Sequence, residues 1–94
     1  MTKSIMQKEK ECYVCKTTLN LEKHHCIHGI ANRKKAEADG LWVWLCHAHH
    51  TGSNQAVHLN RTNDLKLIRK AQEAWERKNG STEDFIKRYG KNYK

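Results

Sequence analysis

The sequence predicts a small α+β domain held together by a bound metal ion. Two short stretches have the pattern of β-strands, and the C-terminal third has apolar residues at helical spacing. The chain has 94 residues and a hydrophobic fraction of 37%, which is little material for a core. A domain this small and polar often needs a structural metal or disulfides, and four cysteines are present. We therefore expect one domain over residues 1–94.

The chain is strongly basic, with 18 Lys and Arg against 10 Asp and Glu and a net charge of +8. This balance indicates a polyanionic partner, nucleic acid first, although a merely soluble basic surface is the plain alternative. The longest apolar run, Leu41–Cys46, is far too short to cross a bilayer, so no membrane partner is expected. The charged N-terminus has no apolar signal segment, so we expect a cytoplasmic protein.

The N-terminal elements are an arm and a strand. Residues 1–11 are expected to be a solvated basic arm whose lysines can contact a phosphate backbone. Two cysteines, Cys12 and Cys15, follow it. Alternating apolar and polar residues then predict a first strand from Leu21 to Ile27, and Gly29 ends it.

The middle of the chain predicts a short helix and a second strand. Asn32 can cap the helix, which is made of good helix formers and stops at Gly40. The strand covers Leu41–Leu45 and is apolar on both faces, with Trp42 and Trp44 on one of them. We expect these two tryptophans to pack in the core.

A polar loop over Thr51–Asn54 separates this part from a helical C-terminal part over residues 62–94. Leu65, Ile68 and Trp75 recur at helical spacing and predict a helix from about residue 62 to 78. Ser81 starts a last short helix, and Gly90 ends it.

Two short motifs have the spacing of zinc ligands. Cys12-x2-Cys15 and Cys46-x2-His49 each offer two ligands from one turn, which suits tetrahedral zinc. In a cytosolic chain this pattern is more typical of zinc than of a disulfide framework. If residues 46–50 are helical, His50 shares a face with Cys46 as well, so spacing alone leaves His49 and His50 as alternatives. Cys26 is expected to be a small buried apolar residue.

All seven histidines lie between residues 21 and 60, which asks for a chemical reason. Neutral imidazole is both a metal ligand and a proton acceptor near neutral pH. His24 and His25 are neighbours on a strand, so their side chains point to opposite faces. In a catalytic pair the two histidines have different roles: one imidazole binds a metal ion and the other accepts a proton. His28 and His47 are expected to lie at the surface or to contact the metal ligands, rather than to bind the ion themselves.

These features together resemble the HNH endonucleases, the ββα-metal nuclease fold, and most of all their small phage and prophage members. The residues that carry the resemblance are His24-His25, the apolar strand that ends in Leu45-Cys46-His47-Ala48-His49-His50, and His58. The resemblance covers roughly Cys12–Asn60, and the ending Asp84–Tyr93 is similar to tails of such members. It implies a ββα-metal core over residues 12–60 and a location in a bacterial or phage-infected host cytosol.

The resemblance also implies a role for each motif residue. His25 would be the general base, and His24, His50 and His58 would bind the catalytic ion. Cys12, Cys15, Cys46 and His49 would bind the structural zinc. Two departures stand out: Asn32 is the only asparagine available for the family's loop-tethering role, and the ligand spacing beyond the second strand is interrupted before His58.

The function implied is a DNA endonuclease that depends on a divalent ion such as Mg²⁺, Mn²⁺, Ni²⁺ or Zn²⁺ and leaves 5′-phosphate and 3′-hydroxyl ends. Arg33, Lys34, Lys35 and Arg61 could bind flanking phosphates, or could simply form a solvated helix face. A non-catalytic, zinc-stabilised module that binds nucleic acid is the alternative. It accounts for the zinc motif and the charge, but not for His24-His25 or His58.

Overall fold

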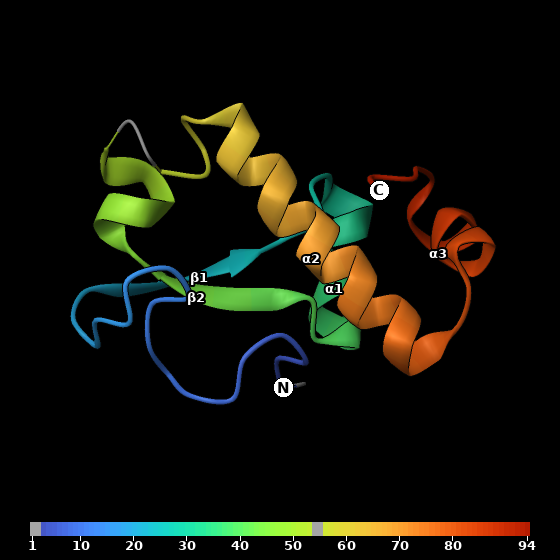
Figure 1. The fold of residues 1–94 in the computed structure, drawn as a ribbon, viewed down its shortest axis with the longest axis horizontal. Coiled ribbons are helices and arrows are strands. Elements are labelled where there is room, and N and C mark those ends of the chain that lie inside the picture. The colour runs from blue at the N-terminus through green and yellow to red at the C-terminus, as the bar shows by residue number, and fades with distance from the viewer. Residues whose placement is uncertain (1–2, 54–55) are drawn as a thin grey trace.

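A two-stranded antiparallel sheet lies across one long helix, with shorter helices at both ends (Figure 1). The computed structural model describes residues 3–53 and 56–94. Its elements in chain order are β1 (Leu21–His25), α1 (Ile30–Asp39), β2 (Trp42–Cys46), the short π-helical turn η1 (Ala48–Gly52), α2 (Arg61–Asn79) and α3 (Thr82–Tyr89). The predicted α+β class is confirmed. Met1 and Thr2 of the expected arm, and Asn54 at the end of the expected loop, lie outside the described residues.

The register of the sheet decides which side chains share a face. Leu21 pairs with Cys46, His24 with Val43 and His25 with Trp42. Directly opposite residues lie on the same face, so His24 lies on the face of Val43, whereas His25 lies on the face of Trp42. The expected separation of the two histidines to opposite faces is therefore met.

Both strands differ slightly from the sequence prediction at the ends that adjoin α1. Gly40 ends α1 in the left-handed conformation, as expected, and the backbone N–H of Leu41 donates to the Ala36 carbonyl. That bond completes the helix end, so β2 starts at Trp42 and runs on to Cys46. β1 ends at His25 rather than Ile27, because the chain turns toward α1 there. A side chain at Gly40 would also collide with the backbone of Lys3.

The start of α1 does not match the prediction. The helix begins at Ile30, and Gly29, with a φ of 104°, stands at its N-cap position. Asn32 lies inside the first turn, so the prediction that Asn32 caps the helix was wrong. Its side-chain amide instead donates to the backbone carbonyl of Tyr89 at 3.2 Å, which ties α1 to the end of α3.

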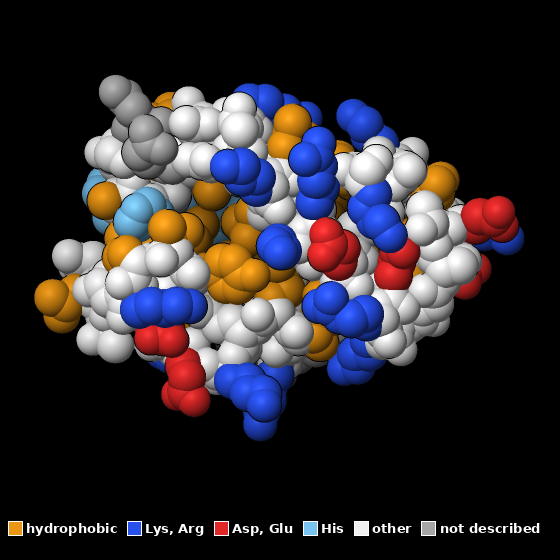
Figure 2. Space-filling view, in the orientation of Figure 1, with side chains coloured by type: hydrophobic (Ala, Val, Ile, Leu, Met, Phe, Trp, Pro, Cys, Tyr) orange, Lys and Arg blue, Asp and Glu red, His pale blue; other side chains and the backbone are white. Residues whose placement is uncertain are grey.

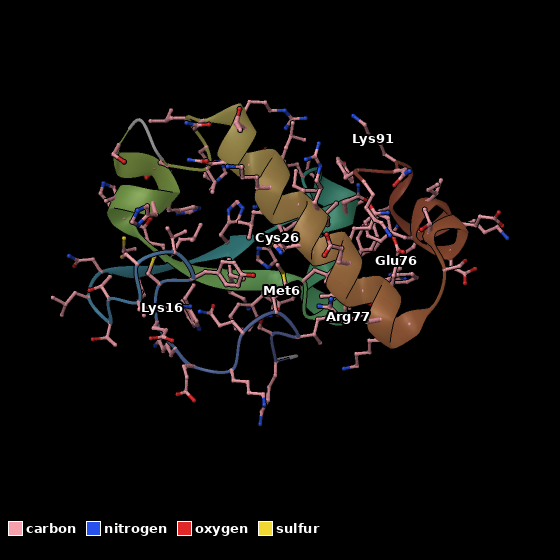
Figure 3. The ribbon with its side chains drawn as sticks, viewed as in Figure 1. Met6, Lys16, Cys26, Glu76, Arg77 and Lys91 are labelled. Atoms are coloured by element: carbon pink, nitrogen blue, oxygen red, sulfur yellow. The ribbon has the colours of Figure 1, made fainter. Side chains whose placement is uncertain are left out.

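The N-terminal segment is packed against β2, so the prediction of a solvated arm was wrong for residues 4–7. The Ser4 hydroxyl donates to the Trp42 carbonyl at 2.6 Å, and the Trp44 N–H donates to Oε1 of Gln7 at 2.8 Å. The physical reason is that the free edge of β2 offers unpaired backbone groups, which the segment satisfies. Its Met6 sulfur contacts the Cys26 thiol at 3.6 Å (Figure 3). Cys26 is fully buried, as predicted.

The two tryptophans lie beneath this segment rather than in the main core. Trp42 is buried and Trp44 is half-buried, and their rings meet edge to face at 5.5 Å. Lys10 from the segment lies 4.7 Å from the centre of the Trp44 ring. The main core is on the other face of the sheet. Its members include Leu41, Val43 and Leu45 from the sheet region, Ile68, Ala71 and Trp75 from α2, and Phe85 and Tyr89 from α3.

The C-terminal helices follow the prediction closely. α2 is one residue longer at each end than the predicted 62–78, and Asn60 caps it by accepting from the Asn63 N–H. A capping box between Ser81 and Asp84 starts α3, and Gly90 ends it. Within the described ranges, no helix combines the length and apolar character needed to cross a membrane.

Asp39, at the end of α1, joins three helices. Its carboxylate accepts hydrogen bonds from the Trp75 indole at 2.9 Å, from the Tyr89 hydroxyl at 2.7 Å and from the Arg88 guanidinium at 2.5 and 2.9 Å. Burial and this carboxylate raise the pKa of the Tyr89 hydroxyl well above its ordinary range. These contacts hold α2 and α3 against α1 and so fix the position of α1 beside the histidines.

Candidate metal centres

Three cysteines and one histidine form a compact four-ligand cluster. The ligand atoms of Cys12, Cys15, Cys46 and His49 all lie within 4.8 Å of one another. The Cys15 and Cys46 sulfurs are 3.8 Å apart, and Nδ1 of His49 lies 3.2 Å from the Cys46 sulfur and 3.7 Å from the Cys12 sulfur. A tetrahedral zinc ion with Zn–S bonds of about 2.3 Å requires sulfurs about 3.8 Å apart, whereas a disulfide would require about 2 Å. The cluster could therefore hold a metal ion such as zinc.

Backbone hydrogen bonds place the first two of these ligands. The Cys12 N–H donates to the Thr17 carbonyl and the Lys16 N–H donates to the Cys12 carbonyl, which closes a tight turn around Cys15. The Tyr13 N–H donates to the Trp44 carbonyl at 2.8 Å and joins this turn to β2. A metal ion here would connect the N-terminal turn to the end of the sheet, because Cys15 and Cys46 are 31 residues apart in the sequence.

The electrostatics of the cluster favour a thiolate at Cys12. Burial raises the pKa of this thiol, but backbone N–H groups of Cys15, Cys46 and Val14 lower it more, to about 6. In contrast, burial raises the pKa of Cys46, and the neighbouring sulfurs add to that effect. Three facing sulfurs cannot all ionise without a cation between them, whereas a bound zinc ion removes this penalty.

The turn η1 separates the two histidines that spacing left as alternatives. His49 lies in the cysteine cluster, and the adjacent His50 lies in a second group with His24 and His58. Consecutive residues of a helical turn point about 100° apart, so neighbours on η1 can serve two separate sites. The ligand atoms of His24, His50 and His58 also lie within 4.8 Å of one another, which is close enough for one metal ion.

His58 reaches the second group although it lies beyond η1 in the chain. The Val57 N–H donates to the His49 carbonyl, and the His58 N–H donates to the His50 carbonyl. These bonds return the chain to η1 and bring Nε2 of His58 within 3.0 Å of Nε2 of His50. The interruption in sequence spacing therefore does not keep His58 from the other two imidazoles.

His24 is the buried member of the group, and its environment suits a metal ligand. The residue is 2% exposed, and its Nε2 atom finds no hydrogen-bond partner within residues 3–53 and 56–94. A buried polar atom without a partner is costly and calls for an explanation such as a bound ion. Burial, and after it the nearby His50 and His58, lower the pKa of His24 to about 3, so its imidazole is neutral and able to bind a cation.

A carboxylate supports His50 in the manner typical of metal-binding histidines. Nδ1 of His50 lies 2.7 Å from Oε1 of Glu22, which leaves Nε2 facing His58. Hydrogen bonds from His50 and His47 lower the pKa of Glu22, so it is ionised and must accept these bonds. Such a partner fixes the imidazole tautomer and its orientation.

An open cavity of about 410 Å³ lies beside the three histidines. His24, His50 and His58 line it together with His25, His28, Lys23 and Arg33. Nε2 of His25 lies 2.9 Å from Oε1 of Glu37 on α1. His28 lies at the cavity wall, where its Nε2 is 2.9 Å from a carboxylate oxygen of Asp64. The cavity therefore combines a possible cation site, a second imidazole and positive side chains.

The remaining predicted residues are distributed unevenly around this cavity. Arg33 lines it, and Lys34 lines a neighbouring hollow with His25 and Glu37. Arg61 lines another hollow that His28 and His58 also border, and it forms an ion pair with Asp64 at 2.9 Å. Lys35 instead donates to the Arg88 carbonyl at 2.8 Å. Asn32 is not among the residues that line the cavity. His47 is 62% exposed and lies outside the cavity, as expected.

Sequence reasoning missed three carboxylates that support the histidines. These are Glu22 with His50, Glu37 with His25, and Asp64 with His28. Glu22 could have been found, because it is two residues before His24 on a strand and so shares its face. Glu37 and Asp64 lie on helices, and their positions relative to the histidines depend on how those helices pack.

Comparisons of the chain with models of protein families, with curated proteins and with solved structures found no match. What the site can do chemically is therefore inferred from its own geometry.

Proposed function

We propose that the protein is a metal-dependent DNA endonuclease of the HNH type. The observation that carries the proposal is the convergence of His24, His50 and His58 within 4.8 Å, at a cavity that His25 also lines. His24 and His25 are adjacent in sequence but lie on opposite faces of β1, so they can serve different purposes at one cavity. A nuclease of this type needs such a division, with one imidazole on the ion and the other free to accept a proton.

The four-ligand cysteine cluster supports the same proposal through its position. It joins the N-terminal turn to the end of β2, directly before η1, and would hold His49 on one side while His50 faces the cavity. The proposed ββα-metal core differs from that of many HNH nucleases in one respect. The helical element after β2 is only five residues long, so the third histidine comes from the chain beyond it.

Each residue at the cavity has a task in the proposed reaction. His25 accepts a proton from the water that attacks the phosphorus. His24, His50 and His58 hold the divalent ion, which when bound supplies charge stabilisation at the phosphate and at the leaving 3′ oxygen. Arg33 at the cavity and Lys34 beside it bind flanking phosphates, and Arg61 extends the positive surface past His58. The products carry 5′-phosphate and 3′-hydroxyl ends.

The charge distribution favours DNA as the substrate. Lysine and arginine side chains spread over the face seen in Figure 2, with few acidic side chains between them. With a net charge of +8, contacts of this kind give affinity that depends on salt and little on sequence.

Plasmid cleavage tests the proposal directly. Purified protein is incubated with supercoiled DNA and Mg²⁺, Mn²⁺, Ni²⁺ or Zn²⁺, with and without EDTA. We expect cleavage in at least one metal, loss of cleavage in EDTA, and a loss of about 100-fold or more in His25→Ala. Glu83→Ala is the control, because this residue is exposed on α3 and outside the cavity, and it should retain activity.

Two outcomes would contradict the proposal. Cleavage that survives His25→Ala in a clean preparation would remove the proposed base. A wild-type protein that binds DNA but never cuts it with any of the metals would instead support the non-catalytic zinc module.

Cobalt binding tests the two metal centres separately from activity. Co²⁺ in the cysteine cluster gives intense sulfur-to-metal charge-transfer bands, which a site of three histidines cannot give. We expect Cys15→Ser to lose these bands, and His58→Ala to keep them while losing a second, weaker Co²⁺ site. A single site in the wild-type protein would contradict the assignment of His24, His50 and His58.

A further inference from the structure

Glu37 on α1 holds the histidine that has the role of base in the proposed function. Its Oε1 atom lies 2.9 Å from Nε2 of His25 and 2.6 Å from Nζ of Lys23. Both partners are on β1, on the sheet face opposite His24. Glu37 therefore spans the gap between α1 and the strand that carries the two histidines.

The charge state of Glu37 determines which nitrogen of His25 carries the proton. The hydrogen bond from Lys23, and next to it the one from His25, lower the pKa of Glu37 despite the opposing effect of burial. An ionised carboxylate can only accept hydrogen bonds. Nε2 of His25 must therefore donate, and in the neutral ring Nδ1 is then left with the free lone pair.

The second oxygen of Glu37 indicates that this arrangement is more than a structural ion pair. Oε2 is buried and has no hydrogen-bond partner within the described part of the chain. An ion pair kept only for stability would be expected to satisfy both oxygens, because an unpaired buried acceptor is costly. Here both hydrogen bonds go to Oε1, so the carboxylate is turned toward Lys23 and His25 on β1.

We propose that Glu37 is a positioning residue for His25: it fixes the orientation and tautomer of this imidazole, so that Nδ1 is the atom that accepts the proton from water. This inference rests on the proposed nuclease function. Glu37 itself does not line the main cavity beside the three histidines, so it acts through His25. When Nδ1 takes up the proton, the imidazolium that forms lies beside a negative charge and is stabilised by it.

The test compares three variants in the zinc-loaded, full-length protein. Glu37→Ala removes the partner of His25. Glu37→Gln keeps the shape and an acceptor oxygen but removes the charge, and it covers the case in which the alanine variant fails to fold. Lys23→Met removes the ion pair while keeping Glu37 beside His25. Because Lys23 also lines the cavity, this variant is compared only by the spectrum of His25, where it separates a structural role from a positioning role.

Imidazole ¹⁵N–¹H spectra give a readout that does not depend on activity. We expect a hydrogen-bonded Nε2–H signal from His25, assigned by its loss in His25→Ala, in the wild type and in Lys23→Met but not in Glu37→Ala. In plasmid cleavage, Glu37→Ala should lower kcat at least about 10- to 100-fold with little change in KM, since removing the carboxylate partner of a metal-binding histidine costs about that much. Glu37→Gln should fall between this variant and the wild type.

The outcomes separate this inference from the proposed function. If Glu37→Ala keeps the His25 signal and the wild-type kcat, or if Lys23→Met loses the His25 signal as Glu37→Ala does, positioning by Glu37 is refuted and the nuclease proposal stands. If the wild type cuts no DNA, the nuclease proposal fails and takes the catalytic part of this inference with it. The spectra alone then decide whether Glu37 fixes the ring.

Discussion

Replacing Cys15 with serine should destabilise the protein only when zinc is present. Cys15 is exposed, and its sulfur contacts the Cys46 sulfur at 3.8 Å. Without a metal ion, such a surface substitution is expected to change the free energy of unfolding by no more than about 0.5 kcal/mol. With zinc, the same change removes one of four ligands from the cluster.

The expected loss is large compared with the stability of the domain. Structural zinc contributes about 10–16 kcal/mol in small zinc-dependent domains, so one ligand in four corresponds to roughly 2.5–4 kcal/mol. A chain of 94 residues has a free energy of unfolding of about 5–14 kcal/mol, at about 0.05–0.15 kcal/mol per residue. Loss of the ligand should thus remove about a fifth of this stability or more.

Urea denaturation followed by tryptophan fluorescence measures this difference. The wild type, Cys15→Ser and the control Cys26→Ala are compared with and without a zinc chelator, and zinc content is measured after dialysis. Cys26 is fully buried outside the cluster, so its substitution should cost the same in both conditions. The reasoning would be refuted if Cys15→Ser cost the same with and without chelator, or if the wild type held no zinc and ignored the chelator.

Three further predictions concern the helices that border the site. Asp39→Ala should lower the free energy of unfolding by about 2–4 kcal/mol in thermal denaturation, because it leaves the buried Trp75 and Tyr89 donors without their acceptor, whereas Arg88 is 37% exposed and can be solvated; a loss below about 1 kcal/mol would contradict this. Phe85→Ala should cost about 3–5 kcal/mol in urea denaturation, because the ring is fully buried among other aromatic rings, and an unchanged midpoint would show that the core tolerates the cavity. Asp84→Asn should destabilise α3 in a pH-dependent way. The backbone N–H at the start of the helix lowers the pKa of Asp84 below its ordinary 3.8, so the carboxylate stabilises the folded state above that pH, and this contribution is lost as the pH falls through the lowered pKa. The difference between wild type and variant, followed by circular dichroism, should therefore shrink toward zero in acid, and a constant difference would count against it.

The sequence alone was enough for most of the elements and for the zinc-ligand motifs, with His49 and His50 left as alternatives. Strand alternation, helical spacing and the glycines at positions 40, 80 and 90 are local signals, and the structure has elements where they predict them. The zinc motif is local in the same way, because Cys-x2-Cys and Cys-x2-His each place two ligands on one turn. The resemblance to the HNH endonucleases implied the set His24, His50 and His58 before their positions in space were known.

Tertiary structure decided every feature that depends on segments far apart in the chain. It assigned His49 and His50 to different groups, because η1 turns consecutive side chains in different directions. It placed residues 4–7 on the edge of β2 and moved Asn32 from the expected cap to a contact with Tyr89. It also put Glu37 against His25 and Asp39 at the junction of three helices. The physical reason is the same in each case. Packing determines which distant segments become hydrogen-bonding partners, and the periodicity of the sequence does not contain that information.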